Sequence, residues 1–119
     1  EALEPGDILF IDSTHVLAVG SDVQYEFLEV VPRVKPGVLV HVHDIFLPAE
    51  YPRSWVLRWR RYWTEQYLLQ AFLAFNSAFE TIWAGHMMHM DRPAALSRML
   101  RSYDPRKVEP GSWWMRRVG

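Results

Sequence analysis

The sequence predicts one α/β domain built on a doubly wound sheet, and three features of its first third carry this prediction. The run Ile-Leu-Phe-Ile at 8–11 is apolar without alternation, which is typical of a strand covered on both faces. An apolar stripe at helical spacing follows, and then a second, β-branched run at 38–42. The order strand, helix, strand with short links requires parallel strands joined by a right-handed crossover.

The crossover helix has clear start and stop signals. Ser21 and Gln24 match a capping box, in which the serine caps the helix and the glutamine reaches back. Pro32 predicts an early end or a kink, and the Pro-Gly pair at 36–37 stops the helix. The predicted buried stripe consists of Val23, Phe27, Val30, Val31 and Val34.

The rest of the chain continues the same alternation. A loop with two prolines at 45–52 leads into a segment rich in arginine and tryptophan at 53–63. Thr64 is predicted to cap a helix that runs to about Asn76, and a strand is predicted at 79–83. The buried face of that helix is predicted to hold Leu68, Leu69, Phe72, Leu73 and Phe75.

Two further elements are predicted near the C-terminus. Asp91 is predicted to cap a short helix with Pro93 in its first turn, and 112–118 is predicted to form the last strand. We therefore expect residues 1–119 to form a single domain. Its parts are a strand-helix-strand unit at 7–44, an insertion at 45–63 and a helix-strand-helix-strand unit at 64–118.

Composition excludes several classes of partner and site. Thirteen basic and 14 acidic residues leave a formal charge of -1, so nothing favours a nucleic-acid partner. The absence of cysteine excludes disulfides and thiolate metal sites. No stretch approaches the roughly 20 apolar residues of a membrane span, so we expect no membrane contact, and the lack of cysteine fits a cytoplasmic chain. The chain lacks an initiator methionine, which suggests that it was cut from something longer.

Three segments together resemble a known enzyme family. They are Gly-Asp-Ile-Leu-Phe-Ile-Asp-Ser-Thr-His at 6–15, Val-Pro-Arg-Val-Lys-Pro-Gly-Val-Leu-Val at 31–40, and His-Asp-Ile-Phe at 43–46. These segments are similar to the second half of the Rossmann-like domain of class I S-adenosylmethionine-dependent methyltransferases. In that family they would be the fourth strand, the next helix with its Pro-Gly exit, and the fifth strand. The resemblance also implies that the last two strands form an antiparallel pair at the sheet edge.

The resemblance implies S-adenosylmethionine as cofactor and a small-molecule acceptor, with a sugar or natural-product hydroxyl favoured. The family's glycine-rich loop after its first strand, and the acid after its second, have no counterpart here. Those parts grip the methionine and ribose ends of the cofactor. The chain is therefore expected to correspond to the C-terminal half of the domain, with one wall of the cofactor site, and not to be competent alone.

The two polar strand ends supply the candidate site residues. Ligands of open α/β sheets bind at the carboxyl ends of the strands, so 12–15 and 43–44 should share one crevice. His15 and His43 are candidate general bases, and Asp44 is expected to act with them. Asp12 and Ser13 are expected to contact the cofactor. Asp12 and Asp44 could also bind Mg²⁺, although the third ligand of metal-dependent relatives is replaced here by a histidine or an isoleucine.

Alternative interpretations of these residues stay open. A strand-terminal aspartate often only caps the following turn, and His41 can simply fill a core position. The segment His-Met-Met-His-Met at 86–90 could suggest a Cu(I) site, but a loop packed by methionines is the simpler interpretation.

Trp55, Trp59 and Trp63 are spaced four apart, so on a helix they would form one aromatic stripe beside several arginines. Such a stripe could stack on nucleobases or simply pack on the sheet. It could instead drive self-association. The functional interpretation is a lid over the acceptor, with Tyr51, Trp55 and Trp59 as its walls.

Two other functions compete with methyl transfer. The chain could be a non-catalytic module that folds through oligomer contacts, or an unrelated doubly wound binding domain. The apolar strand at 8–11 carries no charge or proline, so its free edge predicts a homo-oligomer.

Overall fold

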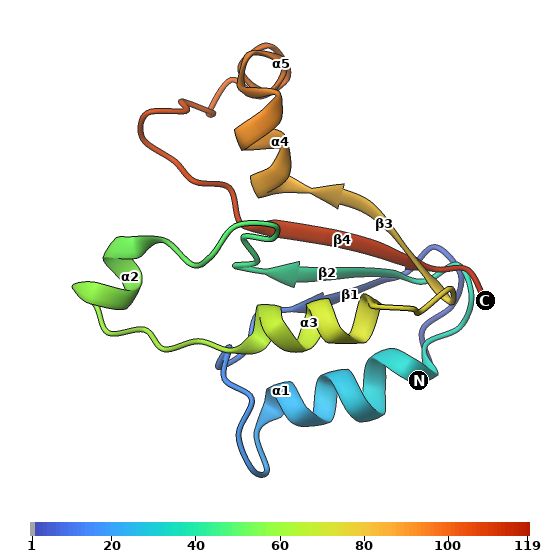
Figure 1. Ribbon diagram of the computed structural model, residues 1–119. Coiled ribbons are helices and arrows are strands. Elements are labelled where there is room, and N and C mark those ends of the chain that lie inside the picture. The colour runs from blue at the N-terminus through green and yellow to red at the C-terminus, as the bar shows by residue number, and fades with distance from the viewer. Residues whose placement is uncertain (1) are drawn as a thin grey trace.

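The computed structural model describes residues 2–119, which form one mixed four-stranded sheet with helices packed mainly on one face (Figure 1). The strands are β1 (Ile8–Ile11), β2 (Leu39–His43), β3 (Phe79–Ala84) and β4 (Ser112–Arg117), in the order β1-β2-β4-β3. β1 and β2 are parallel, whereas β4 runs antiparallel to both β2 and β3. The predicted α/β class, the parallel pair and the antiparallel pair at the edge are confirmed.

The crossover between β1 and β2 is helical but irregular. It consists of α1 (Asp22–Tyr25), a π-helical turn η1 (Glu26–Val30) and a 3₁₀ turn η2 (Val31–Arg33). The predicted cap forms: Ser21 Oγ accepts from the Gln24 amide at 3.2 Å, and Gln24 Oε1 accepts from the Gly20 amide at 2.8 Å. The hydrogen-bond pattern tightens to 3₁₀ at Pro32, which has no amide hydrogen to donate.

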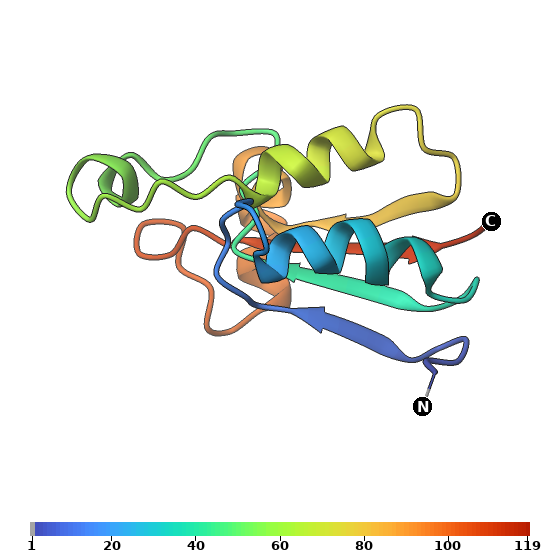
Figure 2. The same ribbon diagram turned by 90° about the horizontal axis from the view of Figure 1, so that it is seen from below.

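The helix α3 (Glu65–Leu73) lies beside α1 on the same face of the sheet, and the core fills the space between these helices and the strands (Figure 2). The apolar stripe predicted for the crossover helix between β1 and β2 is buried, apart from Val30, which is half-buried. The other fully buried core side chains include Val38, Val40, Val42, Leu69 and Met115.

Two details predicted for α3 are wrong. Thr64 precedes the helix, but its hydroxyl accepts from the Leu17 amide at 2.7 Å and caps nothing, because the loop after β1 reaches it first. Phe75 is fully exposed with φ 60°, because the chain leaves the helix at Ala74 and Phe75 no longer lies on the helical face.

The insertion and the segment after β3 also differ from the prediction. The helix α2 (Arg53–Leu57) is too short to carry three tryptophans, so the helical aromatic stripe is wrong. The predicted loop at 86–90 is the helix α4 (Gly85–Asp91), which begins directly where β3 ends. The helix α5 (Pro93–Met99) starts with proline as predicted, but its capping position is Arg92, because Asp91 still belongs to α4.

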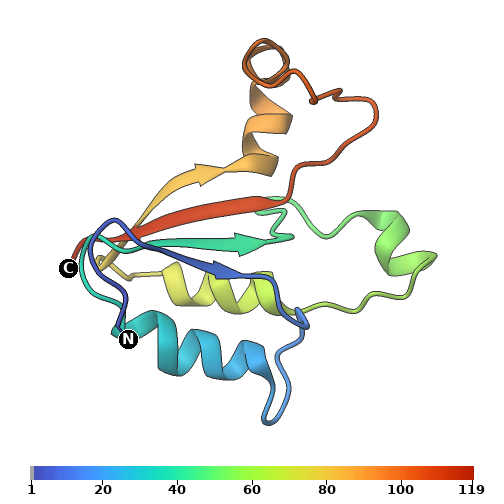
Figure 3. The same cartoon turned by 180° about the vertical axis from the view of Figure 1, so that it is seen from behind.

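The opposite face of the sheet is apolar and largely uncovered by the residues that the structure describes. Ile11 is buried under the helices, whereas Ile8 and Phe10 are 51% and 60% exposed. The prediction that β1 is covered on both faces is therefore wrong. All helices of the parallel unit lie on the other side (Figure 3). A groove of about 630 Å³ on the bare face is lined by Leu39, Ile82, Trp83, Met99, Leu100, Trp114 and Arg116.

The free edge of β1 and this bare face predict self-association. Within residues 2–119, β1 pairs with β2 alone, so its second row of backbone groups is open to another strand. We expect concentration-dependent association in sedimentation velocity, and we expect Phe10→Lys to shift it toward the monomer. Tyr25→Lys, at an exposed position on α1, is the control. A well-folded monomer at high concentration would contradict this prediction.

None of the helices within residues 2–119 combines the length and the apolar character that crossing a bilayer requires.

Candidate functional site

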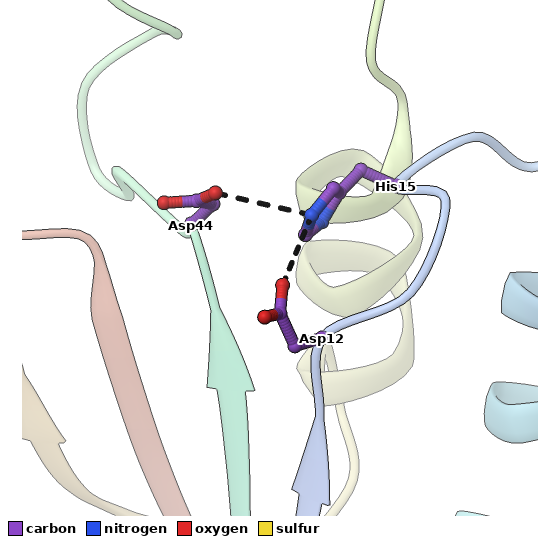
Figure 4. Close-up of side chains that lie close together, drawn as sticks. All are labelled: Asp12, His15 and Asp44. Atoms are coloured by element: carbon purple, nitrogen blue, oxygen red, sulfur yellow. Dashed lines mark ion pairs between the residues drawn. The ribbon is translucent and has the colours of Figure 1, made fainter.

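Asp12, His15 and Asp44 converge at the carboxyl ends of β1 and β2, as predicted (Figure 4). Asp12 directly follows β1, and Asp44 directly follows β2. His15 Nε2 lies 3.4 Å from Asp12 Oδ1 and 3.8 Å from Asp44 Oδ2. The two strand ends are therefore adjacent in space, as the sequence analysis expected.

The backbone around the site is held in an uncommon conformation. His15 and Asp44 have φ of 61° and 58°, in the left-handed region. Asp and His tolerate this region better than most residues, yet it costs roughly 1–2 kcal/mol for each residue. The carbonyl of His15 accepts from the amides of Thr64 and Glu65 at 2.9 and 3.1 Å. These bonds tie the loop after β1 to the start of α3, where the side chain of Glu65 meets the imidazole.

Glu65 completes the site, and sequence reasoning missed it. Its Oε2 lies 2.7 Å from His15 Nδ1, and its side chain is fully buried. Its Oε1 is buried without a hydrogen-bond partner in the part of the chain that the structure describes. An acid in the first turn of a helix is normally a solvent-exposed partner of the helix dipole, so its type and position gave no signal that it turns inward.

The electrostatics of the pair His15 and Glu65 favour a retained proton. Burial lowers the pKa of His15, but the hydrogen bond and charge of Glu65, together with Asp44 and Asp12, outweigh burial and raise this pKa above 6.5. Burial raises the pKa of Glu65, and the hydrogen bond with His15 opposes this rise. The three carboxylates around the imidazole of His15 stabilise positive charge at this site.

The donor atoms also fit a divalent cation. One ligand atom each from Asp12, His15 and Asp44 lies within 4.8 Å of the other two. Ligands about 2.1 Å from a metal lie about 3.0–3.4 Å apart, so small side-chain shifts would close the observed distances. The second ring N–H of a histidine ligand commonly donates a hydrogen bond to a carboxylate, and Glu65 occupies that position here. Two oxygens and one nitrogen suit Mn²⁺, Fe²⁺ or Zn²⁺ better than Mg²⁺.

His43 and Ser13, the other predicted polar residues, lie at the margin. His43 is partly exposed, with its Nε2 3.7 Å from Asp44 Oδ1 and its Nδ1 3.4 Å from His41 Nε2. Ser13 points to the crossover helix, where its hydroxyl donates to Glu26 Oε2 at 2.8 Å. His41 fills a buried position between Phe10 and Trp114, as its structural interpretation predicted, but its Nδ1 has no hydrogen-bond partner within residues 2–119, so the expected bond to the backbone is wrong.

The aromatic insertion adjoins the site through Trp63, which was not among the predicted substrate contacts. Its ring stacks on His15 with centroids 4.1 Å apart, and it meets the edge of Tyr51 at 6.1 Å. Tyr51 is buried, and its hydroxyl accepts from the Gln66 amide at 3.0 Å. Trp59 is 52% exposed. A pocket of about 330 Å³ beside Trp55 is also lined by Pro52, Ser54, His89, Pro105, Arg106, Lys107, Val108 and Glu109.

Comparison of the chain with protein-family models, with curated proteins and with solved structures found no match. The methyltransferase resemblance of the sequence therefore stays a prediction. Any function has to be argued from the geometry and chemistry of the site itself.

Proposed function

We propose that this chain forms the acceptor-activating side of an S-adenosylmethionine-dependent methyltransferase site that acts on a small-molecule hydroxyl, with a sugar or natural product favoured. The observation that carries the proposal is the convergence of Asp12, His15 and Asp44 beyond two parallel strands, with Glu65 buried behind the imidazole. Ligands of open α/β sheets bind at this end of the strands.

The topology supports the same proposal. The parallel pair β1 and β2, joined by a helical crossover and followed by an antiparallel pair at the sheet edge, is what the resemblance to the second half of a Rossmann-like methyltransferase domain implies. Asp12, His15 and Asp44 lie at the two strand ends where the resemblance implies an active site. A fold of this kind hosts many chemistries, so the polar tips carry more weight than the topology.

Asp12, His15 and Asp44 would hold a divalent cation, with Mn²⁺ or Fe²⁺ preferred over the Mg²⁺ expected from the sequence. A bound cation would lower the pKa of an acceptor hydroxyl and fix its oxygen for an in-line attack. Both ring nitrogens of His15 would then be engaged, one by the cation and one by Glu65. His15 would therefore be a ligand and not a general base.

His43 is the histidine left to accept the hydroxyl proton. Its Nε2 lies 3.7 Å from Asp44 Oδ1, beyond hydrogen-bond distance, so this nitrogen would be free to accept a proton beside the cation that Asp44 would help to hold. Its partial exposure lets the proton pass on to solvent. Trp63 stacks on the ring of His15 and is itself packed against Tyr51, so this flank of the imidazole would be shielded from water.

The cofactor would supply an electrophilic methyl group. Of the two residues expected to contact it, Ser13 is engaged with Glu26, and Asp12 faces His15. The glycine-rich loop of the family has no counterpart in the sequence. The proposal therefore gives this chain one wall of the cofactor site and not a complete one.

The test is a calorimetric titration of the purified chain with S-adenosylhomocysteine, with and without Mn²⁺. We expect saturable binding that Asp12→Asn weakens, because Asp12 belongs both to the proposed cation site and to the proposed cofactor wall. A folded chain that binds Mn²⁺ but no S-adenosylhomocysteine would contradict methyl transfer by this chain and leave the cation site standing. A folded chain that binds neither Mn²⁺ nor S-adenosylhomocysteine would contradict the proposal as a whole.

A second candidate function, a non-catalytic oligomerising module, is favoured by the bare apolar face and the open edge of β1. Strong self-association without any binding of cation or cofactor would favour it over catalysis.

A further inference from the structure

The rings of Trp55, Trp59 and Trp63 surround the guanidinium group of Arg61, and we refer to these three rings as the indole cage. The guanidinium carbon lies 4.7, 5.0 and 5.1 Å from the three ring centroids. Trp55 and Trp63 stand nearly perpendicular, 5.1 Å apart, and Trp59 lies 6.2 Å from Trp55. A cation within about 6 Å of aromatic faces is attracted by their quadrupoles, so the cage is built to hold positive charge.

The backbone folds back on itself to form the cage. The helix α2 ends at Leu57, and Arg60 takes a left-handed conformation with φ 51°. That conformation is unfavourable for any residue with a Cβ atom. The Arg61 amide then donates to the carbonyl of Trp55 at 2.9 Å, and the Trp59 amide donates to the carbonyl of Ser54 at 3.1 Å. These bonds fix a loop whose side chains converge on one point.

The guanidinium group of Arg61 faces the three indole rings. Within residues 2–119 its guanidinium forms no ion pair and no hydrogen bond, although arginine normally forks onto carboxylates or carbonyls. A pocket that stabilises a cation without hydrogen-bond acceptors is suited to quaternary ammonium groups, which have no hydrogens to donate.

The cage is open to solvent on one side and touches the candidate site on the other. Trp59 is half exposed, and Trp55 lines the surface pocket of about 330 Å³. Trp63 stacks on His15, whose neighbours Asp12, Asp44 and Glu65 are acidic. Their negative field adds to the preference of the cage for cations.

We propose that the indole cage is a binding site for an organic cation of the quaternary ammonium class, and that Arg61 is its internal occupant in the free protein. A ligand would exchange with the guanidinium group, which would move into water on its flexible side chain. Arg61 thus acts as a tethered competitor that sets the apparent affinity of the cage. The inference concerns binding only, and it stands whether or not the chain takes part in methyl transfer.

The experiment is a calorimetric and tryptophan-fluorescence titration of the full chain with choline. Arg61→Gln is expected to bind choline at least about tenfold more tightly than the wild type, because the competing occupant is gone. Adding Trp59→Ala to Arg61→Gln is expected to weaken that binding by about tenfold through loss of one wall. Arg58→Gln is the matched control, since Arg58 is an exposed neighbour outside the cage.

The neutral isostere 3,3-dimethylbutanol separates cation recognition from simple apolar binding. We expect it to bind Arg61→Gln far more weakly than choline does. Equal binding of the two ligands would overturn the proposal, as would a folded Arg61→Gln variant that binds choline no better than Arg58→Gln. Arg61 would then serve only to stabilise the folded loop.

A second measurement covers the case in which Arg61→Gln does not fold. In the wild type, saturating choline should move the NMR resonance of the Arg61 Nε–H group toward the position of a solvated arginine. A resonance that does not move at any choline concentration would also overturn the proposal.

Discussion

Asp44→Asn is expected to reduce the affinity of the chain for Mn²⁺ by more than about 100-fold, because even outer partners of a metal ligand are worth 10–100-fold. Asp44 supplies one of the three donor atoms that lie within 4.8 Å of one another. Asparagine has nearly the same shape, and it tolerates the left-handed φ of 58° at this position. The loss should therefore report on the carboxylate and not on the fold.

The measurement is loss of the free Mn²⁺ signal in electron paramagnetic resonance, which needs no activity assay. Asp12→Asn should behave like Asp44→Asn, whereas Asp91→Asn is the control, since Asp91 is an exposed acid at the end of α4. Wild-type affinity in both site variants would show that the three side chains form only an ion-pair cluster around a protonated His15.

The fold could be predicted from the sequence wherever local patterns and long-range packing agree. The capping box at Ser21 and the stop at Gly37 bracket the crossover, and the β-branched run becomes β2. The same patterns failed where tertiary contacts decide. Thr64 has the right type for a cap, but the Leu17 amide reaches its hydroxyl, and no local pattern contains that contact.

The tryptophan spacing shows how periodicity misleads. A spacing of four predicts one helical stripe, yet α2 ends at Leu57 and a left-handed Arg60 turns the chain back. The three rings still meet, around Arg61 instead of along a helix. What the sequence lacked was any sign that a non-glycine residue would take a positive φ.

Part of the candidate site could likewise be predicted from the sequence, and part could not. Asp12, His15 and Asp44 could be predicted because parallel strands bring their carboxyl ends to one edge of a sheet. Glu65 and Trp63 could not, because both come from a segment about 50 residues beyond His15 that meets the site only through tertiary packing. Their types, an acid in a first helical turn and an aromatic before it, are common without any function.

Glu65→Gln is expected to lower the pKa of His15 from above 6.5 to below it. In the wild type, burial alone lowers this pKa, and the hydrogen bond and charge of Glu65 are the largest effects that raise it. Glutamine can still accept the Nδ1 hydrogen but removes the charge. The proton on His15 competes with a cation for Nε2, so wild-type Mn²⁺ binding should strengthen as the pH rises through the folded-state pKa and level off above it.

The variant should move that rise to lower pH and weaken the plateau affinity by about 10–100-fold, because the charged partner behind the ligand is lost. The pH dependence of the free energy of unfolding of the metal-free chain provides an independent check. A pKa raised by folding contributes stability below pH 6.5 that is lost as the pH rises through the folded value, so the wild type should become less stable above pH 6.5. In Glu65→Gln the His15 contribution should reverse and increase with pH up to 6.5.

An NMR titration of the His15 ring, with urea unfolding at pH 5.5 and 8.5, measures both effects. His15→Asn, which keeps a residue that tolerates the left-handed conformation, should abolish the pH dependence of Mn²⁺ binding. If the pKa of His15 stays above 6.5 in Glu65→Gln, then Asp12 and Asp44 hold its proton. Glu65 would then only orient the ring, and the two carboxylates proposed to bind the cation would also be the groups that hold the competing proton on His15.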